Sequence, residues 1–558
     1  MRLSNRHVDV SYSGSVHRVP VGTRVDEFLR QVDGDLPDTV LAALVNRRQV
    51  MLDFPLRGKV ELDLVRYGTR GGELVYKRSV SLMFYDACLD LYPKVRLTIG
   101  QSLGNSYHYQ VRGEDLPDLK IMARRLEARM RKIHKENRPF VRETVTIEEI
   151  EDVFRGWGCE DKLALLATRR SSTVHTIRCG RFIDIAHSPY APHTGCLPTF
   201  GVTAYGDGLV LRFPRRGNRE RLPRFSARPK LYATYVETRN WQELLGVHQV
   251  GQLNRLSLNG EITPLIRISE GLHEKKIARI ADEIYERAAR VRLIAIAGPS
   301  SSGKTTFAKR LGIQLRVNGI EPVSLSLDSY YVDRAKTPLD DEGHHDFENL
   351  EAIDLELFHG QLADLLKGKE VLTPGYDFTV GRRKPKEKWK PLRLRRDQVL
   401  VIEGIHGLNH RLTESVARDQ KYRIYISALT QLAIDDHNRI FTADARLIRR
   451  IVRDRFFRGF SAERTLELWE RVRRGEGRWI FPFQEEADVM FNSALVYEPA
   501  VLKTYAERFL LQVPRTSRAY PEAYRLLKFL SLFVPIFPDE VPHTSILREF
   551  IGGSGFNY

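Results

Sequence analysis

The residues from Gly298 to Thr306 have the types and spacing of a phosphate-binding loop. They read Gly-Pro-Ser-Ser-Ser-Gly-Lys-Thr-Thr and fit the pattern Gly-x₄-Gly-Lys-Ser/Thr. Glycines at both ends of the pattern let loop N–H groups converge on phosphate oxygens, with Lys304 neutralising charge and the Thr305 hydroxyl binding Mg²⁺. The predicted nucleotide-binding residues are Gly298, Pro299, Ser300, Ser301, Ser302, Gly303, Lys304, Thr305 and Thr306.

The sequence on both sides of the loop has the elements that such a loop needs. The apolar run 292–297 predicts a buried strand, and 306–315 predicts a helix. Apolar strands, for example 322–327, 398–402 and 422–426, then alternate with amphipathic helices up to about residue 512. This alternation predicts an α/β fold with a parallel, doubly wound sheet.

Two carboxylates come at the ends of predicted strands. Asp328 follows the strand after the loop, where it can accept a proton from an attacking hydroxyl or position Mg²⁺. A structural role at a turn or helix cap is the alternative for Asp328. Glu403 ends the strand 399–403 and is a candidate Mg²⁺ ligand.

An arginine-rich helix follows. Arg446, Arg449, Arg450 and Arg453 share one helical face, and Arg455 and Arg458 come next. We expect this face to clamp transferred phosphate as part of a lid, with an RNA-binding or solvated face as the alternative. No Asn-Lys-x-Asp sequence follows the loop, which argues against a GTPase.

Bulk properties restrict the class of protein. The chain has 558 residues, a net charge of +17 and four cysteines without Cys-x-x-Cys spacing. The length predicts three or four domains, and the positive charge favours polyanionic partners. The cysteine usage, the lack of a leader-like start and the lack of a spanning segment predict a cytoplasmic protein without membrane contact.

The front of the chain predicts smaller α+β units. We expect a hairpin within 8–21, a helix at 25–32, strands at 40–45 and 60–64, and a break at Gly71-Gly72. A helix is expected at 119–137, with a capped helix start at Thr146 and short strands between 173 and 213. Later helices are expected at 270–290, 522–533 and 544–551.

Residues 292–500 resemble the uridine kinase/phosphoribulokinase family. The resemblance is carried by GPSSSGKTT, LSLDSYY, HDFENLEAIDLELF, PGYDF, VLVIEGIHGL and RLIRRIVRDRFFRG. It implies ATP and Mg²⁺ as cofactors, catalytic roles for Asp328, Lys304 and Glu403, and metal ligation by Thr305 and Glu403. It also implies ATP contacts from Arg446, Arg450 and Arg453. The implied substrate-binding residues are Asp328, Tyr331, Glu348, Tyr376, Phe378 and Arg455.

Two positions depart from the family pattern. Uridine kinases carry a pyrimidine-contacting His shortly after the Tyr-Asp-Phe, where this chain has Gly381 followed by Arg382 and Arg383. Glu348 stands where those enzymes have a ribose-contacting Asp. The reaction class is unaffected, but the base of the substrate is left open.

The front half resembles two domains of threonyl-tRNA synthetases. Residues 1–66 resemble a TGS domain, and residues 75–230 resemble the editing domain through DLYP, MRKIHKENRPF and APHTG. The four editing positions read Ser79, Met83, Ala186 and Tyr190 instead of His and Cys. We therefore expect a retained fold without editing chemistry and without a metal site there.

These observations combine into one functional hypothesis and one alternative. The hypothesis is an ATP-dependent kinase for the hydroxyl of a small substrate, with a nucleoside favoured. The alternative is an RNA- or tRNA-binding protein with a nucleotide-gated loop domain, using the arginines at 212, 215, 216, 219, 221 and 224. The expected domains are 1–67, 72–265, 270–512 and 513–558, and the homo-oligomeric state is left open.

Overall fold

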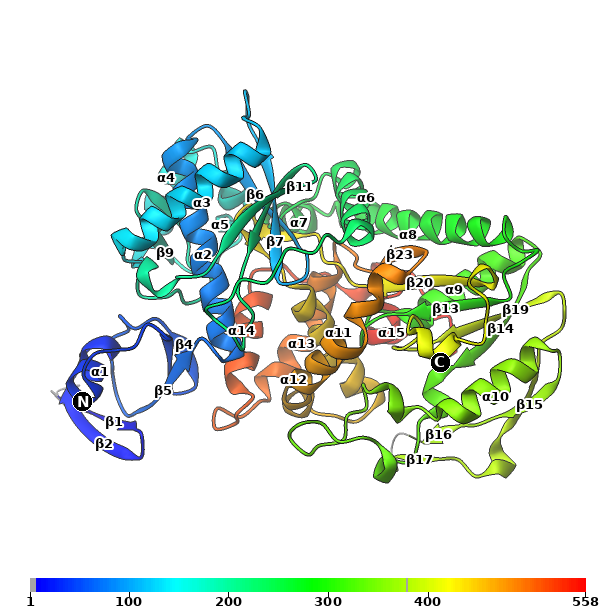
Figure 1. Cartoon of the computed structure of the whole chain (residues 1–558). Helices are drawn as coiled ribbons and strands as arrows, with labels where there is room; N and C mark the ends of the chain where they lie inside the picture. The colour runs from blue at the N-terminus through cyan, green and yellow to red at the C-terminus, as the bar shows by residue number, and fades with distance from the viewer. Residues whose placement is uncertain (1–6, 378–379, 558) are drawn as a thin grey trace.

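The computed structural model describes residues 7–377 and 380–557. A small module at one end (residues 7–67) and a large parallel sheet at the other are joined through a second module (residues 70–245) (Figure 1). The C-terminal helices, orange to red in Figure 1, fold back between these parts and contact all of them.

The first module is a mixed sheet with one helix, as expected. Its strand order is β2-β1-β5-β3-β4, and apolar side chains of the strands pack against Phe28 and Leu29 of the helix. The elements are β1 (His7–Tyr12), β2 (Ser15–Pro20), α1 (Val25–Asp33), β3 (Val40–Val45), β4 (Arg48–Val50) and β5 (Val60–Arg66).

The second module contains two antiparallel sheets and two long helices. The sheets have the orders β11-β12-β7-β6 and β10-β9-β8. Its helices are α2 (Arg70–Leu91) and α3 (Leu119–Glu136). Its strands are β6 (Arg96–Ser102), β7 (Ser106–Arg112), β8 (Val141–Thr146), β9 (Thr173–Cys179), β10 (Phe182–Ile185), β11 (Gly201–Tyr205) and β12 (Gly208–Arg212).

The expected break at Gly71-Gly72 is wrong, because both glycines lie in the first turn of α2. Thr69 caps this helix by accepting a hydrogen bond from the Gly72 N–H. A Cβ on Gly72 would lie 2.0 Å from the Arg66 carbonyl oxygen, so glycine is required by close packing of the helix start on β5. The expected capping box at Thr146 is confirmed at the start of α4.

Three further helices of the second module and the two helices that follow it join its core to that of the parallel sheet. They are α4 (Ile147–Gly156), α5 (Glu160–Leu166), α6 (Pro229–Leu245), α7 (Val250–Leu258) and α8 (Ile262–Tyr285). Phe154 and Leu165 belong to the same buried cluster as Ile294 and Ile296 of the sheet. The boundary expected at 265–270 falls inside α8, and the division into four domains stays a prediction.

The expected parallel sheet is confirmed. Its order is β14-β19-β13-β20-β23, and every neighbouring pair is parallel. The strands are β13 (Leu293–Ala297), β14 (Glu321–Ser326), β19 (Gln398–Glu403), β20 (Lys421–Ser427) and β23 (Val489–Asn492). The first strand in sequence therefore lies in the centre, where its carboxyl end is flanked by those of β19 and β20.

Alternation of side chains explains why this sheet is buried on both faces. Ile294 and Ile296 of β13 pack with α8 and α9 on one face. Leu293 and Ala295 pack on the other face, with α10. Such burial produces the unbroken apolar run seen in the sequence.

The helices around the sheet include the C-terminal region. They are α9 (Lys304–Val317), α10 (Leu355–Leu366), α11 (Thr442–Phe457), α12 (Ala462–Trp479), α13 (Glu498–Leu511), α14 (Tyr520–Leu530) and α15 (Arg548–Ile551). The helix expected at 544–551 is shorter than predicted, because Ser545 caps a tight turn and α15 begins only at Arg548. Among the described helices, none combines the length and apolarity needed to cross a bilayer.

A short hairpin next to the sheet fixes the second module in place. It is formed by β21 (Ala433–Asp435) and β22 (Asn438–Arg439). The His437 ring at its tip lies 4.4 Å from the Tyr85 ring centroid. Next to the turn, Lys162 bridges Asp184 at 2.5 Å and Asp435 at 3.2 Å, all three buried. Since a buried charge needs its partner, this contact joins the two parts rigidly.

The thiols provide a test of this packing. Burial raises the pKa of Cys88 and Cys196 to about 12 and that of Cys159 to about 11, and it raises the pKa of Cys179 further. At pH 8 we expect about one thiolate in a thousand or fewer at each site, so iodoacetamide should label the native protein slowly and the urea-unfolded protein fast. Rapid labelling of any cysteine in the native protein would contradict the packing described.

Candidate active site

The phosphate-binding loop lies at the carboxyl end of β13 and at the start of α9, as expected. The N–H groups of the loop and of the first turn of α9 form a positive end suited to anions. Lys304 folds over the loop, and its Nζ donates to the carbonyl oxygens of Gly298 at 3.0 Å and Pro299 at 3.3 Å. Lys304 therefore stands above the phosphate cradle.

Thr305 and Glu403 meet at this edge of the sheet. The Thr305 Oγ1 lies 3.2 and 3.3 Å from the two carboxylate oxygens of Glu403. Burial raises the pKa of Glu403 to about 7, with Lys304 lowering it and Asp328 and Glu549 raising it. A hydroxyl beside an electrostatically crowded carboxylate fits a divalent cation with oxygen ligands, so these residues suit Mg²⁺.

Asp328 lies on the same edge, in the turn that follows β14. Burial raises its pKa, while Lys304, Arg458 and Arg453 lower it. The Asp328 charge also raises the pKa of Glu403, which places both carboxylates in one electrostatic environment. Desolvation increases the proton affinity of Asp328, as a general base requires.

The arginines of α11 do not form a solvated face. Arg446 is 1% exposed and Arg449 is fully buried. Arg446 donates from Nη2 to Glu476 at 2.7 Å and from Nη1 to the Ser300 carbonyl at 3.0 Å. Arg449 pairs with Glu498 and donates to the Ser493 carbonyl at 2.8 Å. The solvated alternative is therefore wrong for these two residues, which hold α11 against the loop.

Arg450, Arg453 and Arg458 gather around buried Asp454. Arg450 donates to the Ser300 Oγ at 2.8 Å and to Asp454 at 3.3 Å. Arg453 contacts Asp454 at 2.9 Å. Burial and Arg453 lower the pKa of Arg458 to about 10, because three cations share one carboxylate. This surplus of positive charge faces Asp328.

Arg458 was not among the predicted site residues, and Arg455 was. The Arg455 guanidinium lies 5.9 Å from the centroid of Phe509 on α13, and it is not among the charges that act on Asp328. Arg458 is the residue that follows the last residue of α11. It does not lie on the helical face that the i, i+3, i+4 spacing of the other arginines predicts. In the sequence, Arg458 could have been found from its position four residues after Asp454, which is the spacing of an ion pair along a helix.

Tyr331, Glu348 and Tyr376 lie close to one another and to Asp328. The Tyr331 and Tyr376 rings lie 5.7 Å apart, and the Tyr331 hydroxyl donates to the Phe347 carbonyl at 3.2 Å. Burial and Glu476 raise the pKa of Glu348 to about 7, while Arg450 and Lys304 lower it. Asp328 and Glu348 both act on Tyr331, which places the three together. The predicted Phe378 lies outside the described residues.

Arg334 fills the space at Gly381, where the family pattern has a histidine. Gly381 has φ +70°, and a Cβ there would lie 2.6 Å from the Arg334 Nε. The Arg334 N–H donates to the Gly381 carbonyl at 2.9 Å. Arg382 is exposed, and Arg383 pairs with Asp354 at 2.9 Å. Gly381 therefore provides no side chain where the family pattern has a histidine, and the Arg334 guanidinium lies beside it.

Two carboxylates already occupy donors of the phosphate cradle. Glu476 accepts a hydrogen bond from the Ser300 N–H at 3.2 Å. Glu549 of α15 accepts from the Thr306 N–H at 3.1 Å and from its hydroxyl at 2.8 Å. Since loop N–H groups cradle the α- and β-phosphates of a nucleotide, Glu549 holds an anion where phosphate would bind. Nothing in the sequence pattern indicated Glu549.

The former editing positions are packed as part of a core. The Ser79 Oγ accepts a hydrogen bond from the Ala191 N–H at 2.8 Å, and Met83 and Tyr190 are buried. Ala186 lies farther out, in the wall of a surface cavity. These four side chains offer no set of metal ligands.

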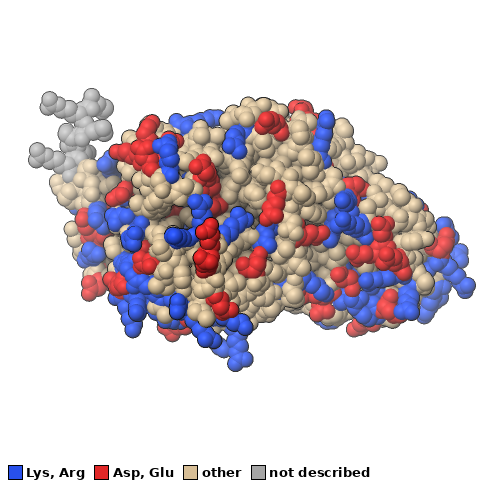
Figure 2. All heavy atoms as spheres, turned by 90° about the horizontal axis from the view of Figure 1, so that it is seen from above, with Lys and Arg blue, Asp and Glu red and all other residues tan. Residues whose placement is uncertain are grey.

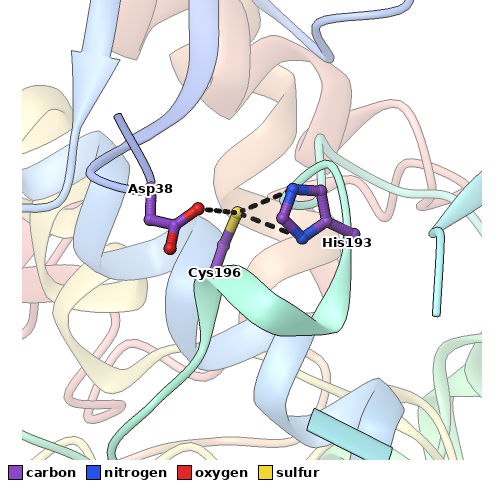
Figure 3. Close-up of side chains that lie close together, drawn as sticks. All are labelled: Asp38, His193 and Cys196. Atoms are coloured by element: carbon purple, nitrogen blue, oxygen red, sulfur yellow. Dashed lines mark hydrogen bonds between the residues drawn. The ribbon is translucent and has the colours of Figure 1, made fainter. Parts of the chain in front are cut away.

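A different group of potential ligands lies between the first and second modules (Figure 3). The Cys196 Sγ lies 3.6 Å from His193 Nε2 and 3.9 Å from Asp38 Oδ1. No sequence pattern joins these residues, because Asp38 comes from the other module. Burial and Asp38 raise the pKa of the Cys196 thiol to about 12, so this thiol donates to the carboxylate.

The arginines expected to bind RNA are partly used in internal contacts. Arg216 pairs with Glu470 and donates to the Gly68 carbonyl at 3.1 Å. Arg219 donates to the Cys196 carbonyl at 2.7 Å, and Arg212 to the Pro223 carbonyl at 3.4 Å. This loop fastens the second module to its neighbours.

Comparison with known proteins relates the two halves of the chain to different families. Residues 293–497 match the phosphoribulokinase / uridine kinase family. A uridine kinase from Brevibacillus brevis is 30% identical over 199 residues, which are 36% of this chain and 83% of that enzyme. The fold is that of a P-loop kinase.

The N-terminal half is similar to threonine–tRNA ligases. The Desulforamulus reducens ligase is 32% identical over 187 residues, which are 33% of this chain. The chain spans only 29% of that ligase. A solved structure described as a possible uridine kinase from Bacillus stearothermophilus is 18% identical, with a TM-score of 0.27, and covers 39% of this chain and 100% of its own.

Glu549 provides a test of the occupied cradle. We expect Glu549→Ala to bind ATP about tenfold more tightly, because a charge-assisted hydrogen bond worth about 1.5–3 kcal/mol no longer competes with phosphate. Calorimetric titration with ATP and Mg²⁺ measures this. The matched control is Asp539→Ala, which removes an exposed carboxylate from the same segment. Unchanged or weaker ATP binding by Glu549→Ala would show that Glu549 does not compete.

Glu476 provides a test of the buried pairing. Glu476→Gln should destabilise the protein by about 3–5 kcal/mol, because it leaves Arg446 buried without its carboxylate. The thermal unfolding midpoint should fall accordingly. Glu470→Gln on the same helix breaks an ion pair whose side chains are 39% and 38% exposed, so it should change stability by less than about 1 kcal/mol. Equal effects of the two variants would refute this assignment.

Proposed function

Because the chain belongs to the phosphoribulokinase/uridine kinase family, we propose that it transfers the γ-phosphate of ATP to a hydroxyl group of a nucleoside. The observation that carries the proposal is the meeting of Thr305, Glu403 and Asp328 at the mouth of the phosphate loop. In-line phosphoryl transfer needs a cradle, a metal site and a base, and these groups supply each of them.

The proposed mechanism assigns one task to each group. Asp328 accepts the proton of the acceptor hydroxyl. The oxygen of that hydroxyl attacks the γ-phosphorus, and the bond between the γ-phosphorus and the β-phosphate oxygen breaks. Lys304 balances charge on the phosphates. Thr305 and Glu403 would hold Mg²⁺, which when bound neutralises β- and γ-phosphate charge.

Arg453 and Arg458 are proposed to stabilise the transferred phosphoryl group. Both act on Asp328, and with Arg450 they share a single carboxylate, Asp454. Positive charge left uncompensated beside the reacting atoms stabilises the equatorial oxygens of the transition state. Arg446 and Arg450 would support the loop through Ser300.

The acceptor is proposed to be a nucleoside held between Tyr331 and Tyr376, with Glu348 near its sugar. Arg334 beside Gly381 argues that the base is read differently than in uridine kinases, because a guanidinium only donates hydrogen bonds.

The remaining assignments extend this proposal. The first module is proposed to be a TGS domain and the second an editing-type domain that has lost its catalytic residues. We place the protein in the cytoplasm, in keeping with its four free thiols.

Asp328→Asn tests the catalytic assignment. We expect phosphoryl transfer to fall by about 10²–10⁴-fold with ATP affinity retained, because the amide cannot take the proton. The assay is ³²P transfer from ATP to a panel of nucleosides and other small alcohols, with binding followed by calorimetry.

Asp341→Asn is the matched control, since its carboxylate is exposed and pairs only with Arg478 among the described contacts. Full activity of Asp328→Asn would remove Asp328 from the mechanism. Absence of transfer to any panel member by the wild-type protein would contradict the nucleoside assignment.

A further inference from the structure

A large cleft opens between three parts of the chain, away from the phosphate loop. Its volume is about 810 Å³. One wall comes from the β3–β4 turn of the first module, a second from β8 and β9, and a third from α14 and the segment before it. A cleft of this size accommodates a nucleotide-sized ligand.

The charges around this cleft are almost all positive. Glu61 is the one acidic residue among the lining residues. The lining cations are Arg47, Arg48, Arg57, Arg142, Arg515 and Lys528. Glu61 pairs with Arg47 at 3.2 Å, and no ion pair joins the other five to a carboxylate within the described part of the chain.

Two titratable groups at the cleft lie close to several of these cations. Burial and then Arg142, Arg48 and Arg169 lower the pKa of Lys528. Burial, Arg142, Lys528 and Arg169 likewise lower the pKa of His175, which also lines the cleft. Burial is the larger cause of each shift, and the neighbouring cations, which come from separate elements, add to it.

The aromatic side chain of Tyr524 arranges two of these cations. The Arg48 guanidinium lies 4.8 Å and the Lys528 ammonium 5.2 Å from its ring centroid. These contacts orient the cations but do not neutralise them. Folding therefore brings together charges from residues 48, 142 and 528 without supplying an opposite charge.

On the face shown in Figure 2, Lys and Arg are interspersed with Asp and Glu. The cleft gathers six cations and one carboxylate on one concave surface, which is a local excess of positive charge. Such an excess in a concave site raises the local concentration of anions.

We propose that this cleft is a second binding site, separate from the phosphate loop, for a ligand that carries phosphate groups. Arg48, Arg142 and Lys528 contact the phosphates, and Arg515 and Arg57 extend the positive surface at the rim. The shared chemistry is phosphate, supplied either by an RNA strand or by a small phosphorylated metabolite. An anion here relieves the repulsion among the cations.

Direct binding measurements test the proposal without any kinase assay. The full-length protein is titrated with a fluorescein-labelled 12-nucleotide single-stranded RNA, and separately with inorganic pyrophosphate by calorimetry, both without ATP. The test variant is Arg142→Ala/Lys528→Ala. The matched control is Arg124→Ala/Arg125→Ala, which removes two exposed cations of α3 that lie outside the cleft.

We expect the test variant to lose at least tenfold in affinity for one of the two probes and the control to bind like the wild-type protein. Loss of RNA binding with a reduced dependence on salt identifies nucleic acid as the source, whereas loss of pyrophosphate binding alone identifies a small ligand. Equal binding by test and control variants, or no binding of either probe to the wild-type protein at low salt, overturns the proposal. Unchanged thermal unfolding of both variants excludes misfolding, and failure here leaves the kinase assignment untouched.

Discussion

The buried ion pairs between α11 and its neighbours are the constraint on which the candidate active site depends. Arg446 joins Glu476 to the Ser300 carbonyl, and Arg449 joins Glu498 to the Ser493 carbonyl. Because each charge has lost its water, removal of one partner would leave the other unpaired at a cost of several kcal/mol. These ion pairs therefore hold the arginine-rich helix α11 against the phosphate-binding loop.

This arrangement separates arginines that support the site from arginines that can act in it. Arg446 and Arg449 donate their hydrogen bonds to carboxylates and carbonyl oxygens. Arg453 and Arg458 instead share Asp454 and lie near Asp328. On the other side of the loop, Glu403, Asp328 and Glu348 are crowded carboxylates whose pKa values are raised chiefly by burial. Cations and carboxylates thus face each other across the space where phosphate and metal would bind.

The C-terminal segment contacts this site, and the second module contacts the hairpin that precedes α11. Glu549 contacts Thr306 at the start of α9, and Asp444 on α11 pairs with Arg525 of α14. The hairpin that leads into α11 carries His437 between the second module's aromatic rings. The helix that bears the site arginines is therefore fastened at its front end to the half of the chain that resembles a tRNA ligase.

The phosphate loop, the parallel sheet and the two strand-end carboxylates could be predicted from the sequence, because each depends on local spacing and on burial along one strand. It also indicated the family and the replacement at Gly381. Only the tertiary structure decided which arginines are buried, since Glu476 and Glu498 lie on other helices. Contacts of this kind, like Glu549 on Thr306 and the cations that meet at the cleft, join residues far apart in the chain. The periodicity of a sequence describes one helix or strand at a time. It therefore cannot show which charged residue of another element packs against it.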